Sequence, residues 1–296
     1  MRSAFLRSTV AAVLLTAAAG ASAESGYNAG SPWLGWGYQD SGNADLPFFY
    51  HLYPNLNWAE VQEILPLTDG SAVVVGSTRV SNNGGGLTTG MVKLTPAGDP
   101  DPAFGTSGFQ YGGGSDWVTD AAIDGQGQIL ALDGHTLCRF DVQNGAPLAF
   151  AGSNKTCIDI GTLMGNKDFS HNSLAVQPGD GRIVVAGFVY DMKWKPVIVR
   201  LKTDATLDPS FSGDGVTFVP AASYGIARIR RAGNGKLVFV GASGDAQPFI
   251  GRVRTDGQLD AWPAQQPVIP ASWWLGDLVL VDNPMSTEDD IVVVSD

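Results

Sequence analysis

Gly181-Arg182-Ile183-Val184-Val185-Ala186-Gly187 combines a polar turn with a short β-branched run, and four other stretches of the chain repeat this pattern. Short apolar runs bounded by turn residues are typical of β-strands. The positions equivalent to Gly187 recur at intervals of 57, 54, 54 and 54 residues, and they are Gly76, Asp133, Gly187, Gly241 and Ser295. A period of this size predicts a repeat architecture in which neighbouring units bury each other's apolar faces.

Each repeat contains enough apolar runs for four short strands, and the sequence shows no long helical period. The expected first strands cover residues 61–65, 118–123, 173–176, 226–229 and 275–281. The third strand carries a basic residue, which is Lys93, Arg139, Arg200 or Arg252. We expect these recurring side chains to pack along their strands with partnered charges. Recurring turn aspartates are expected to cap their turns, and they are Asp101, Asp208 and Asp260.

Residues 172–215 show the repeat most clearly, in Ser173-Leu174-Ala175-Val176-Gln177-Pro178, then Val199-Arg200-Leu201, then Leu207-Asp208-Pro209-Ser210-Phe211. In these motifs the chain resembles the bacterial delta-60 repeat family. The likeness covers about residues 58–296, and it weakens around 134–166, where the Asp-Pro turn is missing, and in the last repeat. The resemblance implies a β-propeller and implies no general activity.

We predict an all-β protein, a β-propeller of about five four-stranded blades. The delta-60-like repeats at 58–296 divide into blades at 58–114, 115–166, 167–222, 223–272 and a partial one at 273–296. The N-terminal segment 24–57 is expected to supply an outer strand to the last blade and so to remove an exposed edge. Two alternatives stay open: an incompletely closed ring, and a fragment of a larger propeller.

Residues 1–23 have the pattern of a secretory signal peptide, with Arg2 and Arg7 near the start and small residues at Ala21-Ser22-Ala23. Its apolar stretch is shorter than the roughly twenty residues that a membrane-spanning helix requires. We therefore expect an exported protein, periplasmic or extracellular, with no membrane insertion after signal cleavage. The net charge of −11 disfavours nucleic acid as a partner. We expect a monomer.

Cys138 and Cys157 are the only cysteines. Two cysteines in an exported chain predict a disulfide, and these two lie in expected neighbouring strands of one repeat. Two separate buried thiols are the alternative. The chain has no C-x-x-C pattern, so it supports neither redox nor zinc chemistry. We predict no cofactor and no metal.

Aromatic residues recur where the first strand of each repeat begins, and two histidines fall in loops expected at the same end of the propeller. Aromatic faces offer a large contact area at a small entropic cost. The predicted ligand-binding residues are Trp58, Trp117, Phe169, Tyr224, Trp274, His135 and His171. Wedging of the rings between blades is the alternative interpretation. A metal site at the histidines would need a third ligand, for which Asp116, Asp133 or Asp168 is available.

Common catalytic motifs are absent: the sequence has no G-x-S-x-G elbow, P-loop or H-E-x-x-H. We assign no catalytic residue and predict an exported binding or scaffold module that holds a small molecule, a glycan or a protein on its loop face. The alternative is a secreted carbohydrate-active hydrolase with paired carboxylates in the propeller funnel. Its candidate carboxylates, which break the repeat pattern, are Asp116, Asp168, Asp191 and Asp245.

One dense basic spot is formed by Arg228, Arg230 and Arg231. Charged clusters of this kind are usually solvated or paired with carboxylates, and we expect the same here. Capture of an anionic polymer is the alternative.

Overall fold

The computed structural model of the protein describes residues 56–80, 86–114, 116–220, 225–242, 248–261, 275–281 and 290–295. These residues form antiparallel β-sheets and one short helix, α3 (Ile160–Leu163). The chain divides into two compact units: one holds the residues up to Val118 with Asp141–Pro147, and the other holds Thr119–Phe140 and the chain from Leu148 onward. The predicted signal peptide, 1–23, lies outside the described residues, as does 24–55.

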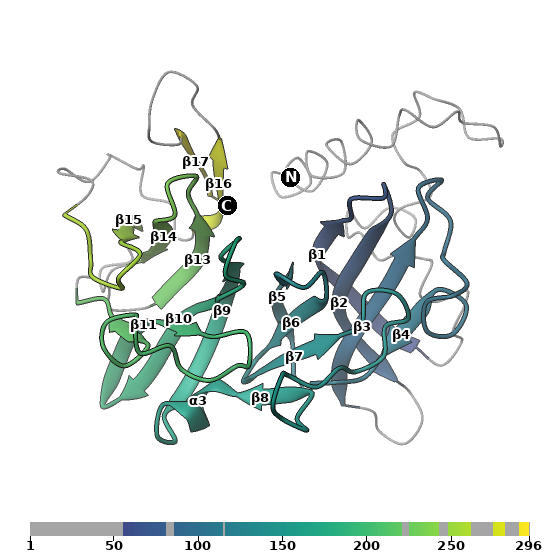
Figure 1. Ribbon diagram of the computed structural model, residues 1–296, viewed down its shortest axis with the longest axis horizontal. Coiled ribbons are helices and arrows are strands. Elements are labelled where there is room, and N and C mark those ends of the chain that lie inside the picture. The colour runs from purple at the N-terminus through teal and green to yellow at the C-terminus, as the bar shows by residue number, and fades with distance from the viewer. Residues whose placement is uncertain are drawn as a thin grey trace. The chain divides into compact units, whose positions relative to one another are not determined.

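The first unit contains a four-stranded antiparallel sheet whose strands follow the order of the sequence (Figure 1). The strands are β1 (Leu56–Pro66), β2 (Ala72–Val80), β3 (Leu87–Leu94) and β4 (Phe109–Tyr111). The turn before β4 is capped as predicted, because Asp101 accepts a hydrogen bond from the N–H of Ala103 at 3.0 Å. Phe104 in the same turn is completely buried. β1 begins at Leu56, two residues before the predicted blade boundary at residue 58.

The second unit repeats this four-strand order twice and continues it in two sheets with fewer described strands (Figure 1). The first sheet has β5 (Val118–Ile123), which starts at the boundary between the units, β6 (Ile129–Asp133), β7 (Thr136–Phe140) and β8 (Cys157–Asp159). The second has β9 (Asp168–Val176), β10 (Ile183–Asp191), β11 (Lys193–Leu201) and β12 (Val216–Phe218). The remaining sheets are β13 (Gly225–Arg231), β14 (Leu237–Ala242) and β15 (Pro248–Val253), and then β16 (Leu275–Val281) with β17 (Asp290–Ser295).

Both faces of the β9–β12 sheet are buried, and this explains why its strands are continuously apolar rather than alternating. Val185 and Val199 point into a core shared with the β5–β8 sheet. Val184 and Ile198, one position away, point into a second core shared with the β13–β15 sheet. Side chains alternate between the two faces of a strand, so a run that is covered on both sides must be apolar throughout. The prediction that neighbouring repeats bury each other's apolar faces is confirmed in this unit.

The recurring basic residues have carboxylate partners, as the repeat pattern predicts. Arg200 is buried, donates from Nε to Asp208 at 2.8 Å, and lies over the ring of Phe211 at 4.6 Å from the ring centre. Arg252 likewise donates from Nε to Asp260, at 2.9 Å. These groups hold the turn after the third strand against the sheet.

Arg139 reaches its carboxylate by another route, since its repeat lacks the Asp-Pro turn. Its Nε donates to Asp124, in the turn between β5 and β6, at 2.8 Å. Its Nη2 donates to Gln126 of the same turn. The repeat thus keeps the buried ion pair although the position of the carboxylate has changed.

The sequence Cys157-Ile158-Asp159-Ile160 predicts a fourth strand of the second repeat, and helix α3 corrects the end of that strand. Strand β8 ends at Asp159, and that residue caps the helix by accepting a hydrogen bond from the N–H of Thr162 at 3.0 Å. An aspartate before a short helical turn satisfies a backbone donor that a strand would have paired with its neighbour.

The predicted disulfide is present between Cys138 and Cys157. The two residues lie directly opposite each other on β7 and β8, with their Cα atoms 4.0 Å apart. The bond therefore fastens the short outer strand β8, which has three residues, to its sheet.

Removal of the disulfide should destabilise the protein. Replacing both residues by alanine, Cys138→Ala with Cys157→Ala, frees a loop with a sequence separation of 19 in the unfolded chain. The expected loss is about 3 kcal/mol in the free energy of unfolding. Urea denaturation of the oxidised protein and the double variant measures it, and equal midpoints in the two curves would contradict a stabilising bond.

The buried aspartate Asp208 should make stability depend on pH in the acid range. Burial raises its pKa, but hydrogen bonds from Ser210 and the charges of Arg200 and Arg182 outweigh burial, so the pKa of Asp208 is lowered. A lowered pKa adds stability above the unfolded value of about 4, and this stability is lost as the pH falls through the folded value. We expect Asp208→Asn to be less stable than the wild type at pH 7 and to lose less stability between about pH 5 and 3.

Urea denaturation across that pH range measures this dependence. The matched control is Asp256→Asn, because the Asp256 side chain is exposed, at 57%. The control should keep the pH profile of the wild type. A wild-type profile in Asp208→Asn would show that this carboxylate does not stabilise the fold.

Candidate functional site

Of the predicted ligand-binding residues, the structure describes the side chains of three. Trp117 is 41% exposed. Its backbone N–H donates to Oδ1 of Asp116 at 2.8 Å. Trp58 and His171 lie in β1 and β9, but their side chains are outside the described part of the structure. Tyr224 and Trp274 lie outside the described residues altogether.

Phe169 and His135 lie next to each other in the second unit. Phe169 is 2% exposed and packs in the core between the β5–β8 and β9–β12 sheets. A ring in this position is wedged between sheets and offers no face to a ligand. The exposed His135 in the turn between β6 and β7 has its Nδ1 at 3.2 Å from the carbonyl oxygen of Phe169.

A β-bulge interrupts the first strand of several sheets at the same place. In β9, β13 and β16 the register shifts by one residue, and the first paired residue after the bulge is Ser173, Arg228 or Asp277. In the other unit, β1 has a bulge that precedes Glu63. A bulge bends the strand and redirects its side chains. The first paired residue after the bulge is polar in each of these strands, although its type differs from one strand to the next.

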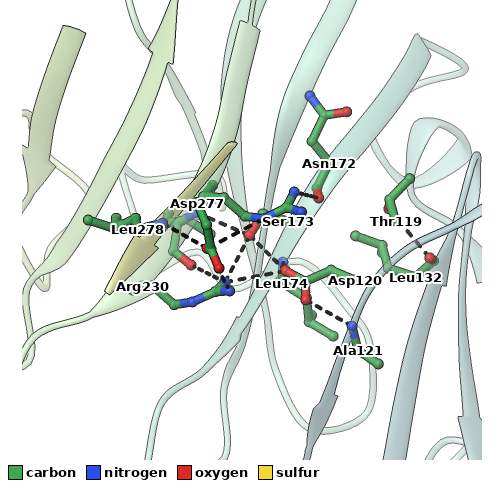
Figure 2. A network of polar contacts seen from close by, with 12 residues as sticks. Thr119, Asp120, Ala121, Leu132, Asn172, Ser173, Leu174, Arg230, Asp277 and Leu278 are labelled. Atoms are coloured by element: carbon green, nitrogen blue, oxygen red, sulfur yellow. Dashed lines mark hydrogen bonds and ion pairs between the residues drawn. The ribbon is translucent and has the colours of Figure 1, made fainter. Parts of the chain in front are cut away.

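These first strands of the second unit meet in a network of polar side chains, with Asp120 of β5 and Ser173 of β9 at its centre (Figure 2). The Ser173 hydroxyl and the Leu174 N–H each donate to Asp120 Oδ2 at 2.8 Å. The Ala121 N–H donates to the other carboxylate oxygen at 2.9 Å. Ser173 in turn accepts from the N–H of Ile229 in β13 at 3.1 Å. Three sheets are thus joined through one hydroxyl group.

Arginines of β13 extend the network to β16 (Figure 2). Nη1 of Arg230 lies 3.4 Å from Asp120 Oδ2 and 3.3 Å from Ser173 Oγ. Nη2 of the same arginine lies 3.4 Å from Asp277 Oδ1. Arg228 approaches Asp277 at 3.7 Å and donates to the carbonyl of Asn172 at 3.2 Å. Two of the three arginines in the predicted basic spot are therefore paired with carboxylates.

The network is built for cohesion rather than for chemistry. Ser173 is completely buried and Asp120 is 3% exposed. Both groups are buried and hydrogen-bonded to neighbouring strands, so a substrate cannot reach them. Nucleophilic catalysis needs a reachable group beside a base. We therefore assign these residues to the packing of the sheets.

An exposed aromatic surface lies elsewhere, at the tip of the β10–β11 hairpin, and sequence reasoning missed it. Tyr190 is 49% and Trp194 43% exposed, and the two are direct cross-strand partners. Asp168 of β9 is exposed and is the partner of Tyr190 on its other side. Directly opposed residues point to the same face of a sheet. Asp168, Tyr190 and Trp194 thus form a row across three strands, which we call the hairpin row.

The rings of the hairpin are held by one another and by β13. The Tyr190 and Trp194 ring centres are 4.9 Å apart, and Phe188 meets the edge of Trp194 at 4.8 Å. Phe188 also lies close to Gly225, where an added Cβ would come within 2.9 Å of its ring. On the opposite face, Val189 and Val197 are buried in the core. The exposed rings therefore stand on a fixed support.

A break in the repeat could have revealed this surface. Strand β10 runs four residues beyond Gly187, as β2 does beyond Gly76, whereas β6 ends at Asp133, the equivalent position. The break lies in the residues of the extension, because those of β10 include Phe188 and Tyr190. The extension carries aromatic residues at alternate positions, which is typical of a strand with one aromatic face.

The described part of the chain contains no group of three or more histidine, cysteine, aspartate or glutamate side chains that could hold a metal ion. Within the same part, no helix is long and apolar enough to cross a membrane. Asp191 lies in β10 with its side chain outside the described part, and Asp245 is outside the described residues.

The model of a β-propeller domain of unknown function, DUF5122, matches residues 67–104 and 179–211. Each match runs from the turn before the second strand to the buried phenylalanine, Phe104 or Phe211, after the third. The match supports a β-propeller-like repeat family. No curated protein matches the chain.

Solved structures resemble the chain at low identity. A protein of unknown function from Bacteroides caccae is 10% identical with a TM-score of 0.35 over 58% of this chain, which spans about half, 52%, of that protein. An α-L-arabinofuranosidase from Clostridium thermocellum is 9% identical with a TM-score of 0.38, over 80% of this chain and 83% of that one. The WD40 domain of Toxoplasma gondii coronin is 11% identical with a TM-score of 0.36, over 77% and 67%. These likenesses say nothing of function.

Loss of the Ser173 hydroxyl should weaken the contact between sheets. Ser173→Ala leaves the buried N–H of Ile229 without its acceptor and removes one donor from Asp120. The expected cost is about 1–3 kcal/mol in the free energy of unfolding. Urea denaturation measures it against Ser153→Ala, in which the changed side chain is exposed, and equal effects of the two changes would contradict the proposed role.

Proposed function

We propose that the protein is a non-catalytic, exported β-propeller of the delta-60 type that binds a glycan on its loop face, through the hairpin row. The observation that carries the proposal is the exposure of Tyr190 and Trp194 beside the exposed carboxylate of Asp168. In the strand order of the sheet, the β10–β11 turn lies at the end that carries the connections between second and third strands. This is the end at which a ligand was expected from the sequence.

The chemistry of the row suits a sugar. The apolar face of a pyranose ring packs on an aromatic ring, and its hydroxyl groups donate to a carboxylate. The two rings are exposed and already ordered by Phe188 and by each other, so binding costs little side-chain entropy. A purely apolar partner would leave the Asp168 carboxylate without water or a hydrogen bond, which is unfavourable.

The hydrolase alternative has weaker support. Glycosidases need two carboxyl groups that flank the scissile bond. In the described part of the chain, Asp120 and Asp277 are tied to arginine and backbone donors. Asp116 accepts the N–H of Trp117. Asp168 alone stands exposed in the hairpin row, and one carboxylate does not supply both roles.

Five closed blades are part of the proposal, with the blade boundaries expected from the sequence. Support comes from the last sheet, which has two strands among the described residues. An unpaired edge favours pairing with another strand, and the segment 24–57 is the proposed source. Export is supported by the disulfide, a bond that persists in oxidising compartments. We also propose that the protein is monomeric.

Trp194→Ala should weaken glycan binding. Loss of one stacking ring is expected to reduce affinity about tenfold, because burying an aromatic face contributes on the order of 1.5 kcal/mol. Affinity electrophoresis of the mature protein on soluble xylan, arabinan, levan and laminarin identifies a ligand, and calorimetry then measures Kd.

The matched control is Phe218→Ala, which removes another exposed aromatic ring, 47% exposed, from the same sheet. Equal weakening in both variants, or no binding to any polysaccharide by the wild type, would contradict the glycan site. Release of reducing sugar from a bound polysaccharide would instead contradict the non-catalytic part of the proposal.

A further inference from the structure

A second candidate site lies at the opposite end of the β9–β12 sheet from the hairpin row, where the β9–β10 turn approaches the turns of the next repeat. A hollow of about 190 Å³ is present there. Three arginines line it, Arg182, Arg200 and Arg231, together with Asp180, Gln177 and Thr255. Three guanidinium groups around one small hollow require compensating negative charge.

Two carboxylates supply part of that charge. Asp208 Oδ2 lies 2.8 Å from Nε of Arg200 and 2.8 Å from Nε of Arg182. Asp180 pairs with Nη1 of Arg182. The remaining donors of Arg200 bond to the carbonyl of Thr255 at 2.7 Å and to the Ser210 hydroxyl at 2.9 Å. Each nitrogen of Arg200 thus has a partner, and among the described residues that line or touch the hollow two carboxylates stand against three guanidinium groups.

Arg231 carries the uncompensated charge. It is the last residue of β13 and is partly buried. Its neighbours Arg228 and Arg230 pair with Asp277, but Arg231 has no hydrogen bond or ion pair to any residue in the described ranges. Nη2 of Arg182 likewise has no partner among those residues. Partly buried guanidinium groups are normally paired, because losing water without a partner is costly.

We propose that this hollow binds a single oxyanion group, a sulfate, phosphate or carboxylate, between Arg231 and Nη2 of Arg182. A planar guanidinium presents paired N–H donors that match two oxygens of such a group. The protein as a whole is acidic, with a net charge of −11, so the attraction is local and is screened by salt. This site is independent of the proposed glycan site, which lies at the other end of the sheet.

Calorimetry with sodium sulfate, sodium phosphate and sodium acetate, at fixed ionic strength, tests the proposal on the full mature protein. We expect at least one of these anions to bind the wild type and Arg231→Gln to bind it about tenfold more weakly, the effect of losing one charge-assisted hydrogen bond. Arg231→Lys keeps the charge but loses the planar pair of donors, and it should retain part of the affinity.

The matched control is Arg254→Gln in the same repeat, whose side chain is 49% exposed and pairs with the exposed Asp256. It should bind like the wild type. Thermal melting without anion checks folding, and Arg231→Gln should melt no lower than the control. A marked drop in its melting temperature would overturn the proposal, because it would make Arg231 a structural residue, as would equal affinity losses in both variants or no anion binding at all.

Dextran sulfate distinguishes the source of the anion. Tighter binding of the polymer than of inorganic sulfate, lost in Arg231→Gln, supports an oxyanion carried on a polysaccharide. Binding of the inorganic anion alone supports a free ion. Polymer binding that Arg231→Gln leaves unchanged would overturn the site, because the polymer would then bind elsewhere.

Discussion

Coverage of both faces of the central β9–β12 sheet is the constraint on which the second unit of this protein depends. A single repeat cannot bury its own apolar faces, and the β9–β12 sheet buries both of its faces by packing between two other sheets. Each methylene group removed from water contributes about 0.8 kcal/mol, so continuous apolar strands such as residues 183–186 strongly favour this packing. The repeat in the sequence follows from this packing, because a repeat that lies between two others must present an apolar face to each of them.

Packing of this kind brings the first strands of successive sheets close together. Polar groups of these strands must then form hydrogen bonds with one another. Bulges precede Ser173, Arg228 and Asp277 in three of these strands, and a bulge bends its strand. Identical residues along these first strands would place like charges together. The strands instead carry complementary groups, with the carboxylates Asp120 and Asp277 on either side of the hydroxyl of Ser173 and the guanidinium of Arg230. The polar network is therefore possible only because the repeats differ at this point.

The sequence was sufficient for those features that recur in every repeat or depend on local spacing. The strands, a charged partner for Arg200 and Arg252, and the Cys138–Cys157 bond were predicted, because each rests on a period or a pair of neighbouring strands. That the turn aspartates Asp208 and Asp260 are those partners was not predicted. The partner of Arg139 was not predicted, since its repeat lacks the Asp-Pro turn. Helix α3 was not predicted, since Ile160 continues the apolar pattern of the preceding strand. Phe169 was expected to face a ligand but is buried, because recurrence at a strand start does not reveal which face the ring occupies.

The network around Asp120 and the hairpin row were missed for a different physical reason. Asp120 meets Ser173 and Arg230 across sequence separations of 53 and 110 residues, and no local pattern reports such contacts. Tyr190 and Trp194 are close in sequence, but their exposure follows from the length of the hairpin beyond the packed part of the sheet.

The middle of each core strand is constrained by the sheets packed against it. The ends of the sheets are less constrained, so the types of side chain can vary at those ends. The β9–β12 sheet illustrates this most clearly. Its hairpin tip carries aromatic rings beside a single carboxylate, and its opposite end carries arginines around a hollow. The same apolar strands support both ends, so exposed residues such as Trp194 can change without altering the core between the sheets. A repeat of this kind can therefore acquire different binding surfaces without loss of its fold.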